Sequence, residues 1–249
     1  MKSIAPILLL SMFLSACTPI DLSVSKDGKI LIPREGGFYS FDPATSKAEL
    51  LSPAKKATFG LYSPSGKGAL LYADGVFYSK PVSKPATKIK SVENLTYAVY
   101  LPGGSALAYT AVTGKSDPEL KEGFAEIHLI ANGKDTLLMK RSAKLLRPLS
   151  DGSLLAIRID KVNKSKENHK SYTGKLVRLS TAGKTTDLCT VTGTGEMFLA
   201  VRGDSKKALL VCYAAGTYKP AAGNRRGKPS EQCYEVDLAT GKVTLVANT

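Results

Sequence analysis

Apolar residues along this chain come in short runs instead of helical stripes. The runs are rich in Val, Ile, Leu and Tyr, and Gly, Pro, Ser and Asp separate them. Five of them lie at residues 29–32, 69–72, 106–109, 154–159 and 208–213. Short β-branched and aromatic runs between turn residues are typical of β-strands, so the pattern predicts an all-β protein.

A tight-turn triplet precedes each run. The triplets are Asp27-Gly28-Lys29, Ser65-Gly66-Lys67, Gly103-Gly104-Ser105, Asp151-Gly152-Ser153 and Gly203-Asp204-Ser205. Gly and Asp supply the positive φ angles that short hairpin turns require. The central residues of the triplets are 38, 38, 48 and 52 residues apart. A recurrence of about 40–50 residues with four strands per unit is typical of propeller blades.

The units can be divided into four strands each, which we label a to d. In the first unit these strands cover residues 22–25, 30–32, 37–42 and 47–51. Strand a of the later units falls at 59–63, 97–101, 145–149 and 197–201, and strand d at 87–91, 136–140, 185–190 and 242–247. We therefore expect a single β-propeller of about five four-stranded blades. A sixth, degenerate blade and a two-sheet β-sandwich are the alternatives.

Three segments carry a more specific resemblance. VSKDGKILIPREGGFYSFDPATSK, YSPSGKGALLYADGVFYSKP and CYEVDLATGKVTLV resemble the TolB-type, WD-like propeller repeat, and the resemblance extends over the chain after residue 17. Pro is replaced in four of the five turns, and the fifth turn reads Arg202-Gly203-Asp204. The resemblance implies a propeller. The separate N-terminal domain of TolB has no counterpart here, so no Tol–Pal role is carried over.

The N-terminus has the features of an export signal. Met1-Lys2 is followed by the mostly apolar residues 4–13 and by Leu14-Ser15-Ala16-Cys17, which resembles a bacterial lipobox. We expect residues 1–16 to be a cleaved lipoprotein signal peptide, 17–21 a lipidated tether and 22–249 the propeller. Acyl chains on Cys17 would anchor the chain in the cell envelope. Thr18 is not Asp, which favours the outer membrane, facing the periplasm, in a Gram-negative host; an ordinary signal peptide is the alternative.

Charge gathers on one predicted face. The chain has 249 residues and a net charge of +14, and 43% of its residues are hydrophobic, which indicates a folded domain. Loops between strands b and c leave one face of a propeller and are long at 112–124, 160–174 and 214–231. The second has four Lys against two acidic residues, and the third has four Lys and Arg against one. The predicted binding face comprises Lys161, Lys164, Lys166, Lys170, Tyr172, Tyr218, Lys219, Arg225, Arg226 and Lys228.

The predicted function is a lipid-anchored binding or scaffolding module. A basic protein at an envelope meets envelope proteins, anionic polymers and anionic headgroups, so these are the expected partners. We expect the membrane to be reached through the lipid, no nucleic acid to bind, and the protein to be monomeric. Solvated loops without a partner are the alternative.

An enzymatic function is not expected. The sequence has no Gly-rich phosphate loop, no Gly-x-Ser-x-Gly motif, no metal-ligand spacing, no Trp and only two His. We expect no cofactor and no metal, with His128 packed or edge-exposed in a strand rather than catalytic, and His169 in a solvated loop. The alternative is a carbohydrate-active, glycosidase-like propeller in the periplasm. Such an enzyme needs facing carboxylates, and only Asp21 and Glu196 flank the predicted strands a.

The cysteines fit export. Cys212 ends strand b and Cys233 begins strand c of the fifth blade, so a hairpin would bring them near disulfide distance. Closing that loop would stabilise the fold by about 3 kcal/mol in the chain-entropy model. We expect a Cys212–Cys233 disulfide with Cys189 left buried. A Cys189–Cys212 pair is less favoured because their strands are not neighbours.

Overall fold

The computed structural model describes residues 23–164, 170–194, 197–220 and 229–248, all as strands, turns and connecting segments. No helix in this part of the chain is long and apolar enough to span a membrane. The all-β prediction is therefore confirmed. The predicted signal peptide and tether, residues 1–21 with Cys17 and Asp21, lie outside the described residues, as do Lys166, His169, Glu196, Arg225, Arg226 and Lys228.

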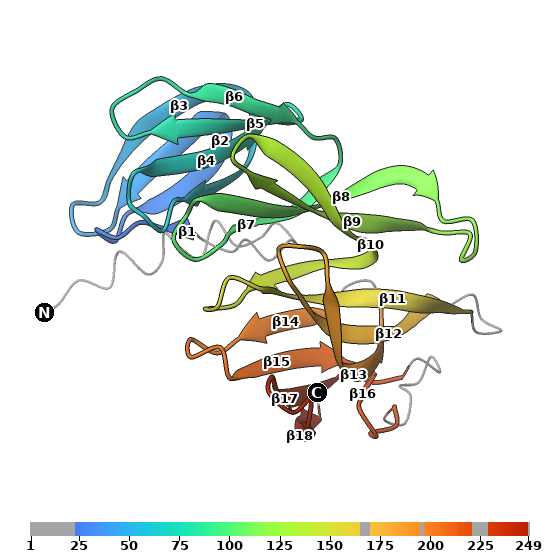
Figure 1. Cartoon of the computed structure of the whole chain (residues 1–249). Helices are drawn as coiled ribbons and strands as arrows, with labels where there is room; N and C mark the ends of the chain where they lie inside the picture. Colours follow the sequence, from blue (N-terminus) through green and yellow to red (C-terminus); the bar gives the residue numbers. More distant parts are fainter. Residues whose placement is uncertain (1–22, 165–169, 195–196, 221–228, 249) are drawn as a thin grey trace, which may run out of the picture. The chain divides into compact units, whose positions relative to one another are not determined.

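The chain divides into two compact units, Met1–Ser91 and Val92–Thr249. The first unit is one antiparallel sheet whose strands pair in chain order (Figure 1). Its strands are β1 (Ser23–Val24), β2 (Ile30–Asp42), β3 (Lys47–Tyr62), β4 (Gly68–Ala73), β5 (Val76–Pro81) and β6 (Thr87–Ser91). Leu31, Phe38, Ala69, Leu71 and Ala73 form its buried core.

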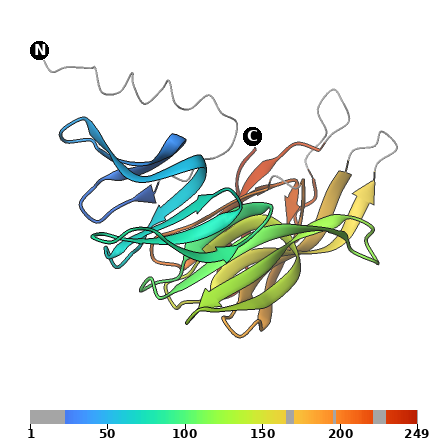
Figure 2. The ribbon, with the colours of Figure 1, turned by 90° about the horizontal axis from the view of Figure 1, so that it is seen from above.

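The second unit holds an eight-stranded and a four-stranded antiparallel sheet. Figure 2 shows the strands of this unit in colours from green to red. The larger sheet contains β7 (Leu95–Tyr100), β8 (Ala106–Ser116), β9 (Gly123–Ala131), β10 (Lys134–Pro148), β11 (Leu154–Lys164), β12 (Lys170–Leu179), β13 (Thr185–Gly193) and β16 (Ala214–Ala215). The smaller contains β14 (Phe198–Val201), β15 (Lys207–Cys212), β17 (Gln232–Asp237) and β18 (Val243–Asn248). Blades four and five share one apolar core, which includes Leu155, Ile157, Val191, Leu199 and Leu210.

The turn triplets do what their residue types predict. In the first four turns a glycine with φ between 72° and 83° donates its N–H to the carbonyl three residues earlier: Gly28 to Ser25, Gly66 to Ser63, Gly104 to Leu101 and Gly152 to Leu149. In the fifth, Ser205 has φ 53° and donates to Arg202 over 2.8 Å. The same turn geometry therefore persists where the glycine has moved.

Blade one differs from the prediction. Residues 33–36 do not form a loop between two strands, because β2 continues from Ile30 to Asp42 without reversing. Its first part pairs with β1 and its second part with β3. Gly37 passes so close to the backbone of Ser52 and Pro53 that a Cβ would lie 3.0 Å from the Pro53 Cα. Blade one therefore lacks the expected b–c hairpin, whereas the other four blades keep the order a, b, c, d.

Two of the predicted d and a strands are fused. β3 combines strand d of blade one with strand a of blade two, and β10 combines the corresponding strands of blades three and four. The pairing of β10 changes from β9 to β11 at Ser142, next to Arg141, which has φ 56°. A bulge thus redirects β10 from one blade to the next without a loop.

Candidate binding surfaces

The predicted long loops of blades three and four are β-hairpins. β8 continues to Ser116 and β9 begins at Gly123, while β11 continues to Lys164 and β12 begins at Lys170. Both hairpins extend on the same side of the second unit (Figure 1). The ranges 112–124 and 160–174 were therefore wrong as loops, because strand pairing continues well past the buried part of each blade. Residues 112–116, 123–124, 160–164 and 170–174 consequently belong to paired strands.

Asp117 organises the turn at the tip of the first hairpin. One carboxylate oxygen accepts the N–H groups of Glu119 at 3.0 Å and Leu120 at 2.9 Å. The other accepts Arg141 Nε at 2.6 Å, and Arg141 Nη2 donates to Glu119 at 2.7 Å. The backbone bond from Leu120, followed by Arg141, lowers the pKa of Asp117. The turn is therefore fixed both within itself and to β10.

Glu122 joins the two hairpins. Its Oε1 lies 2.8 Å from Lys170 Nζ and 4.0 Å from Lys164 Nζ. Lys164 and Lys170 are cross-strand partners, a placement in which like charges repel. The hydrogen bond from Lys170 lowers the pKa of Glu122, and Glu122 in turn raises the pKa of Lys170. We call these two hairpins, β8–β9 and β11–β12 joined through Glu122, the clasped hairpins.

Acidification should release this clasp. The pKa of Glu122 lies below its ordinary value of 4.5, so its contribution to stability is present above that pH and is lost as the pH falls through the lowered value. A Glu122→Gln variant lacks this contribution at every pH. We expect the Tm of the wild type to exceed that of Glu122→Gln at pH 7, and the difference to shrink and then vanish as the pH falls below 4.5 through the lowered pKa of Glu122. A difference independent of pH would contradict the role of the ion pair.

Apolar contacts support the base of the clasped hairpins. The Tyr172 ring meets Phe124 edge-on, with centroids 6.0 Å apart, and Leu120, Phe124 and Tyr172 all pack against the core of blades four and five. A small pocket of about 70 Å³ lies beside Phe124 and Tyr172. Tyr172 is therefore partly used in packing and is not a free platform for a sugar ring.

The predicted b–c loop of the fifth blade, residues 214–231, is only partly a loop. Within residues 214–231, Ala214–Ala215 form β16, which pairs with β13 of blade four. Tyr218 donates its N–H to Ala215 at 3.1 Å and its ring packs against Tyr234 at 5.7 Å. Lys219 follows and is exposed. The described part of this loop is thus attached to blades four and five by backbone pairing and an aromatic contact.

The predicted Cys212–Cys233 disulfide is wrong. Cys189, Cys212 and Cys233 are all free. In the β15–β17 pairing, Cys212 lies opposite Gln232 and Cys233 opposite Val211. A one-residue offset places the two side chains on opposite faces of the sheet, so their Cβ atoms point apart. Cys212 is in the core, where its Sγ donates to the Ala214 carbonyl at 3.2 Å.

The thiols should therefore differ in reactivity. Burial raises the pKa of Cys189 to about 11 and that of Cys212 to about 12, which leaves almost no thiolate at neutral pH. Cys233 is only half-buried. In the folded protein we expect iodoacetamide to modify Cys233 well before Cys189 and Cys212, with all three modified after denaturation without a reductant. Peptide mapping measures this order, and a Cys212–Cys233 crosslinked peptide would contradict it.

His128 is packed, as expected. Its ring stacks on Tyr109 with centroids 5.0 Å apart and lies between Glu126 at 3.4 Å and Asp135 at 3.5 Å. The Tyr109 hydroxyl donates to Asp135 at 3.1 Å, and burial raises the pKa of Tyr109. Among the described residues no group of His, Cys, Asp and Glu has the arrangement of a metal site.

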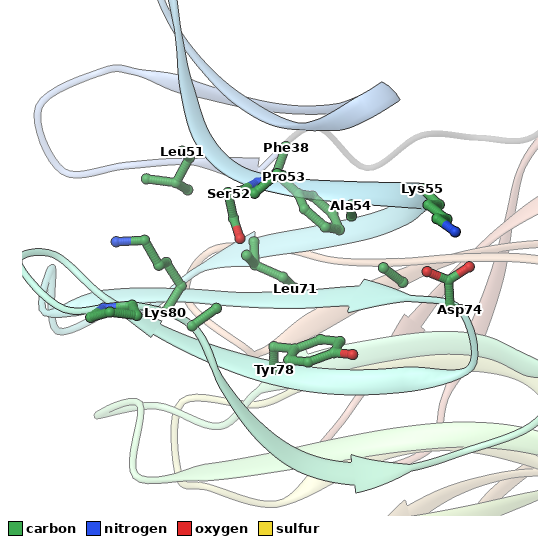
Figure 3. A pocket seen from close by; sticks show the side chains of 13 residues that line it. Phe38, Leu51, Ser52, Pro53, Ala54, Lys55, Leu71, Asp74, Tyr78 and Lys80 are labelled. Atoms are coloured by element: carbon green, nitrogen blue, oxygen red, sulfur yellow. The ribbon is translucent and has the colours of Figure 1, made fainter.

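The first unit contains a pocket that the sequence did not indicate. Its volume is about 600 Å³ (Figure 3). The lining residues are Phe38, Leu51, Ser52, Pro53, Ala54, Lys55, Leu71, Ala73, Asp74, Tyr78, Lys80, Pro85 and Ala86. Phe38, Leu71 and Ala73 are buried beneath it, while Lys55 and Asp74 are exposed at one end. Lys80 donates its ammonium to the carbonyl of Pro81 at 2.9 Å, beside the pocket.

Comparison with solved structures identifies the class of fold. A protein assigned as TolB from Agrobacterium tumefaciens matches with a TM-score of 0.55 and 16% identity, over 90% of this chain and 78% of that one. Hydrazine synthase from Kuenenia stuttgartiensis matches with a TM-score of 0.63 and 13% identity, over 94% of this chain and 69% of that one. An oligogalacturonate lyase in complex with manganese matches with a TM-score of 0.61 and 12% identity, over 92% of this chain and 65% of that one. The chain has a β-propeller fold, as predicted.

The sequence comparisons do not narrow this class further. No protein-family model matches the chain, and no curated protein matches it significantly. Two of the three structural matches bear the names of enzymes with different activities, and a shared fold does not assign either activity to this chain.

Proposed function

We propose that this protein is a lipid-anchored envelope component that binds another envelope protein through its clasped hairpins. The observation that carries the proposal is that two hairpins project from neighbouring blades and are locked together by Glu122, Lys164 and Lys170. Extended elements held on a rigid scaffold are the usual place for recognition. Their fixed geometry reduces the conformational entropy lost on binding.

The charges favour a protein partner over a polyanion. The hairpin β11–β12 carries three lysines, Lys161, Lys164 and Lys170. The carboxylate of Glu122 forms ion pairs with the ammonium groups of Lys164 and Lys170. Asp117 and Glu119 occupy the adjacent tip, where Arg141 partly neutralises them. A polyanion is best held by an unbroken basic surface, whereas mixed charge suits complementary pairing with a protein surface. The surface therefore supports protein recognition first.

A charge-matched pull-down tests the proposal. The lipidated full chain is used as bait in its own envelope. In the first variant of this bait, Ser replaces Lys161, Lys164 and Lys170. The matched control replaces Lys184, Lys206 and Lys242, which are exposed in turns outside the clasped hairpins. We expect the first variant to recover at least about tenfold less of a stoichiometric protein partner than the wild-type chain does. The control should recover the wild-type amount.

The polyanion alternative makes a different prediction. If recognition depends only on net charge, both triple variants elute from heparin at equally lowered salt and lose the same partners. That result would contradict protein recognition by the clasped hairpins. A third result, in which neither variant loses a partner, would place recognition elsewhere on the chain and would also contradict the proposal.

The lipid anchor is tested separately. Replacing Cys17 by Ala removes the acylated residue of the lipobox-like segment, and we expect the chain to move from the detergent phase to the aqueous phase on Triton X-114 partitioning. Cys233→Ala removes a different cysteine and should remain in the detergent phase. A Cys17→Ala chain that stays in the detergent phase would contradict lipid anchoring at this residue.

A further inference from the structure

The pocket of the first unit lies along the edge of a strand. Five consecutive residues of β3, 51–55, line it (Figure 3). Because successive side chains of a strand point to opposite faces, a cavity beneath one face would contact only alternate residues. The opposite wall behaves in that way, since Leu71, Ala73, Tyr78 and Lys80 lie at alternating positions of β4 and β5.

The same stretch of β3 has a strand partner on one edge only. β2 pairs with it through Phe38 opposite Ser52 and Gly37 opposite Pro53. β4 pairs with β3 from Ala57 onward, and among the described residues no strand pairs with the second edge of residues 51–55. Pro53 lacks an N–H, and proline within a sheet is found on edge strands. The pocket is therefore bounded by an open backbone edge.

The chemistry of the walls specifies a kind of ligand. Phe38, Leu71 and Ala73 give an apolar floor, and the volume of about 600 Å³ leaves space above it for several side chains. Lys55 is exposed at one end beside Asp74, and with Lys80 the lining carries two lysines against one carboxylate. Residues 23–91 contain eleven Lys and Arg against five Asp and Glu. An open edge, an apolar floor and an excess of basic residues, both in the lining and in residues 23–91, together match an extended, apolar and acidic polypeptide.

We propose that this pocket binds an extended segment of a partner protein by strand addition to residues 51–55 of β3. Backbone hydrogen bonds to the open edge hold the segment, its alternate apolar side chains enter the pocket, and its acidic side chains meet Lys55 and Lys80. This surface is distinct from the clasped hairpins, so the proposal does not rest on the function proposed above.

The experiment uses peptides of defined sequence and the full chain. The probe is a fluorescein-labelled peptide of alternating Val and Glu, followed by anisotropy. One comparison peptide has Lys in place of Glu, and another is N-methylated at alternate amides and cannot form the ladder. We expect saturable binding of the probe, weakened at least about tenfold by either change.

Protein variants place the binding at the pocket. Ala54→Trp fills the pocket and should weaken binding of the probe about tenfold, whereas Ala48→Trp, on an exposed position of β3 outside the pocket, should not. Lys55→Glu keeps the pocket open and should weaken the Val–Glu peptide while strengthening the Val–Lys peptide. Circular dichroism checks that each variant folds, and the Lys55 variant decides the question if Ala54→Trp does not fold.

Several results would overturn the proposal. These are an absence of saturable binding up to about 1 mM probe, equal binding of the N-methylated peptide, and equal effects of Ala54→Trp and Ala48→Trp. Binding of palmitate that displaces the probe and is lost in Ala54→Trp would assign the pocket to an acyl chain instead. Concentration-dependent dimers abolished by the same variant would assign it to a second copy of the chain.

Discussion

Replacing Gly174 by alanine is expected to loosen the β11–β12 hairpin from its blade. Gly174 lies opposite Ile159, where the pairing of β11 and β12 shifts register. A Cβ there would overlap the Arg158 carbonyl oxygen and would lie 2.9 Å from the carbonyl carbon and 3.1 Å from the Ile159 Cα. These are backbone atoms, so relief requires a shift of the strand. We expect a loss of about 3 kcal/mol, at the upper end for overpacking.

The measurement is local and has a matched control. Because the chain forms two compact units, hydrogen exchange of peptides from β11 and β12 is more informative than one global unfolding curve. Gly123→Ala is the control, since it begins β9 at the corresponding hairpin and a Cβ there approaches only the Lys115 carbonyl, at 3.9 Å. We expect fast exchange in the first variant and near-native exchange in the second. Equal protection would contradict this account of the hairpin base.

Replacing Arg147 by methionine is expected to loosen the contacts between the strands a of blades three, four and five. Arg147 lies on β10, donates Nε to the Leu199 carbonyl of β14 at 2.8 Å, and hydrogen-bonds the Tyr97 hydroxyl of β7. Its guanidinium also lies over the Tyr97 ring, 4.8 Å from the centroid. Methionine keeps much of the length but cannot donate, which leaves partly buried acceptors unsatisfied. We expect a cost of about 2–3 kcal/mol.

The control for this variant is an exposed arginine. Arg202 lies in the first turn of blade five and is 3.7 Å from Asp204, with two thirds of its side chain exposed. Arg202→Met should change stability by less than about 0.5 kcal/mol. A double-mutant cycle with Tyr97→Phe should show strong non-additivity for Arg147. Additive effects would mean that the two side chains act independently and that Arg147 does not link β10 to β7.

The order of the strands in blades two to five could be predicted because the turn before each strand b depends on local residues. Gly66, Gly104 and Gly152 each provide the positive φ angle that ends a turn and starts strand b. Blade one could not be predicted in the same way. Whether the segment 33–37 reverses or continues depends on its packing against Ser52 and Pro53, which lie far along the chain. Nonlocal strand pairing therefore decided the blade in which the predicted b–c hairpin is missing.

The candidate surfaces were predicted in part. Lys161, Lys164, Lys170 and Tyr172 do lie together on one projecting hairpin, since their position depends on the b–c order of the blade. The ion pair with Glu122 was missed, because that residue belongs to another blade and counts in sequence only as one of three acids in its loop.

Two further features depended on strand register. The Cys212–Cys233 pairing failed by a single residue, which periodicity alone cannot fix. The pocket of the first unit arises where β3 passes from pairing with β2 to pairing with β4, and no local motif marks that change.

Site-specific photocrosslinking in the intact envelope tests the central claim most directly. A photoreactive amino acid replaces Lys161 on β11, and the control replaces Lys184 in the turn after β12, at the other end of the same pair of strands. Recognition by the clasped hairpins predicts one discrete protein adduct from position 161, retained in a Gly123→Ala background, reduced in Gly174→Ala, and absent from position 184. Equal adducts from both positions, or none from position 161, would contradict it.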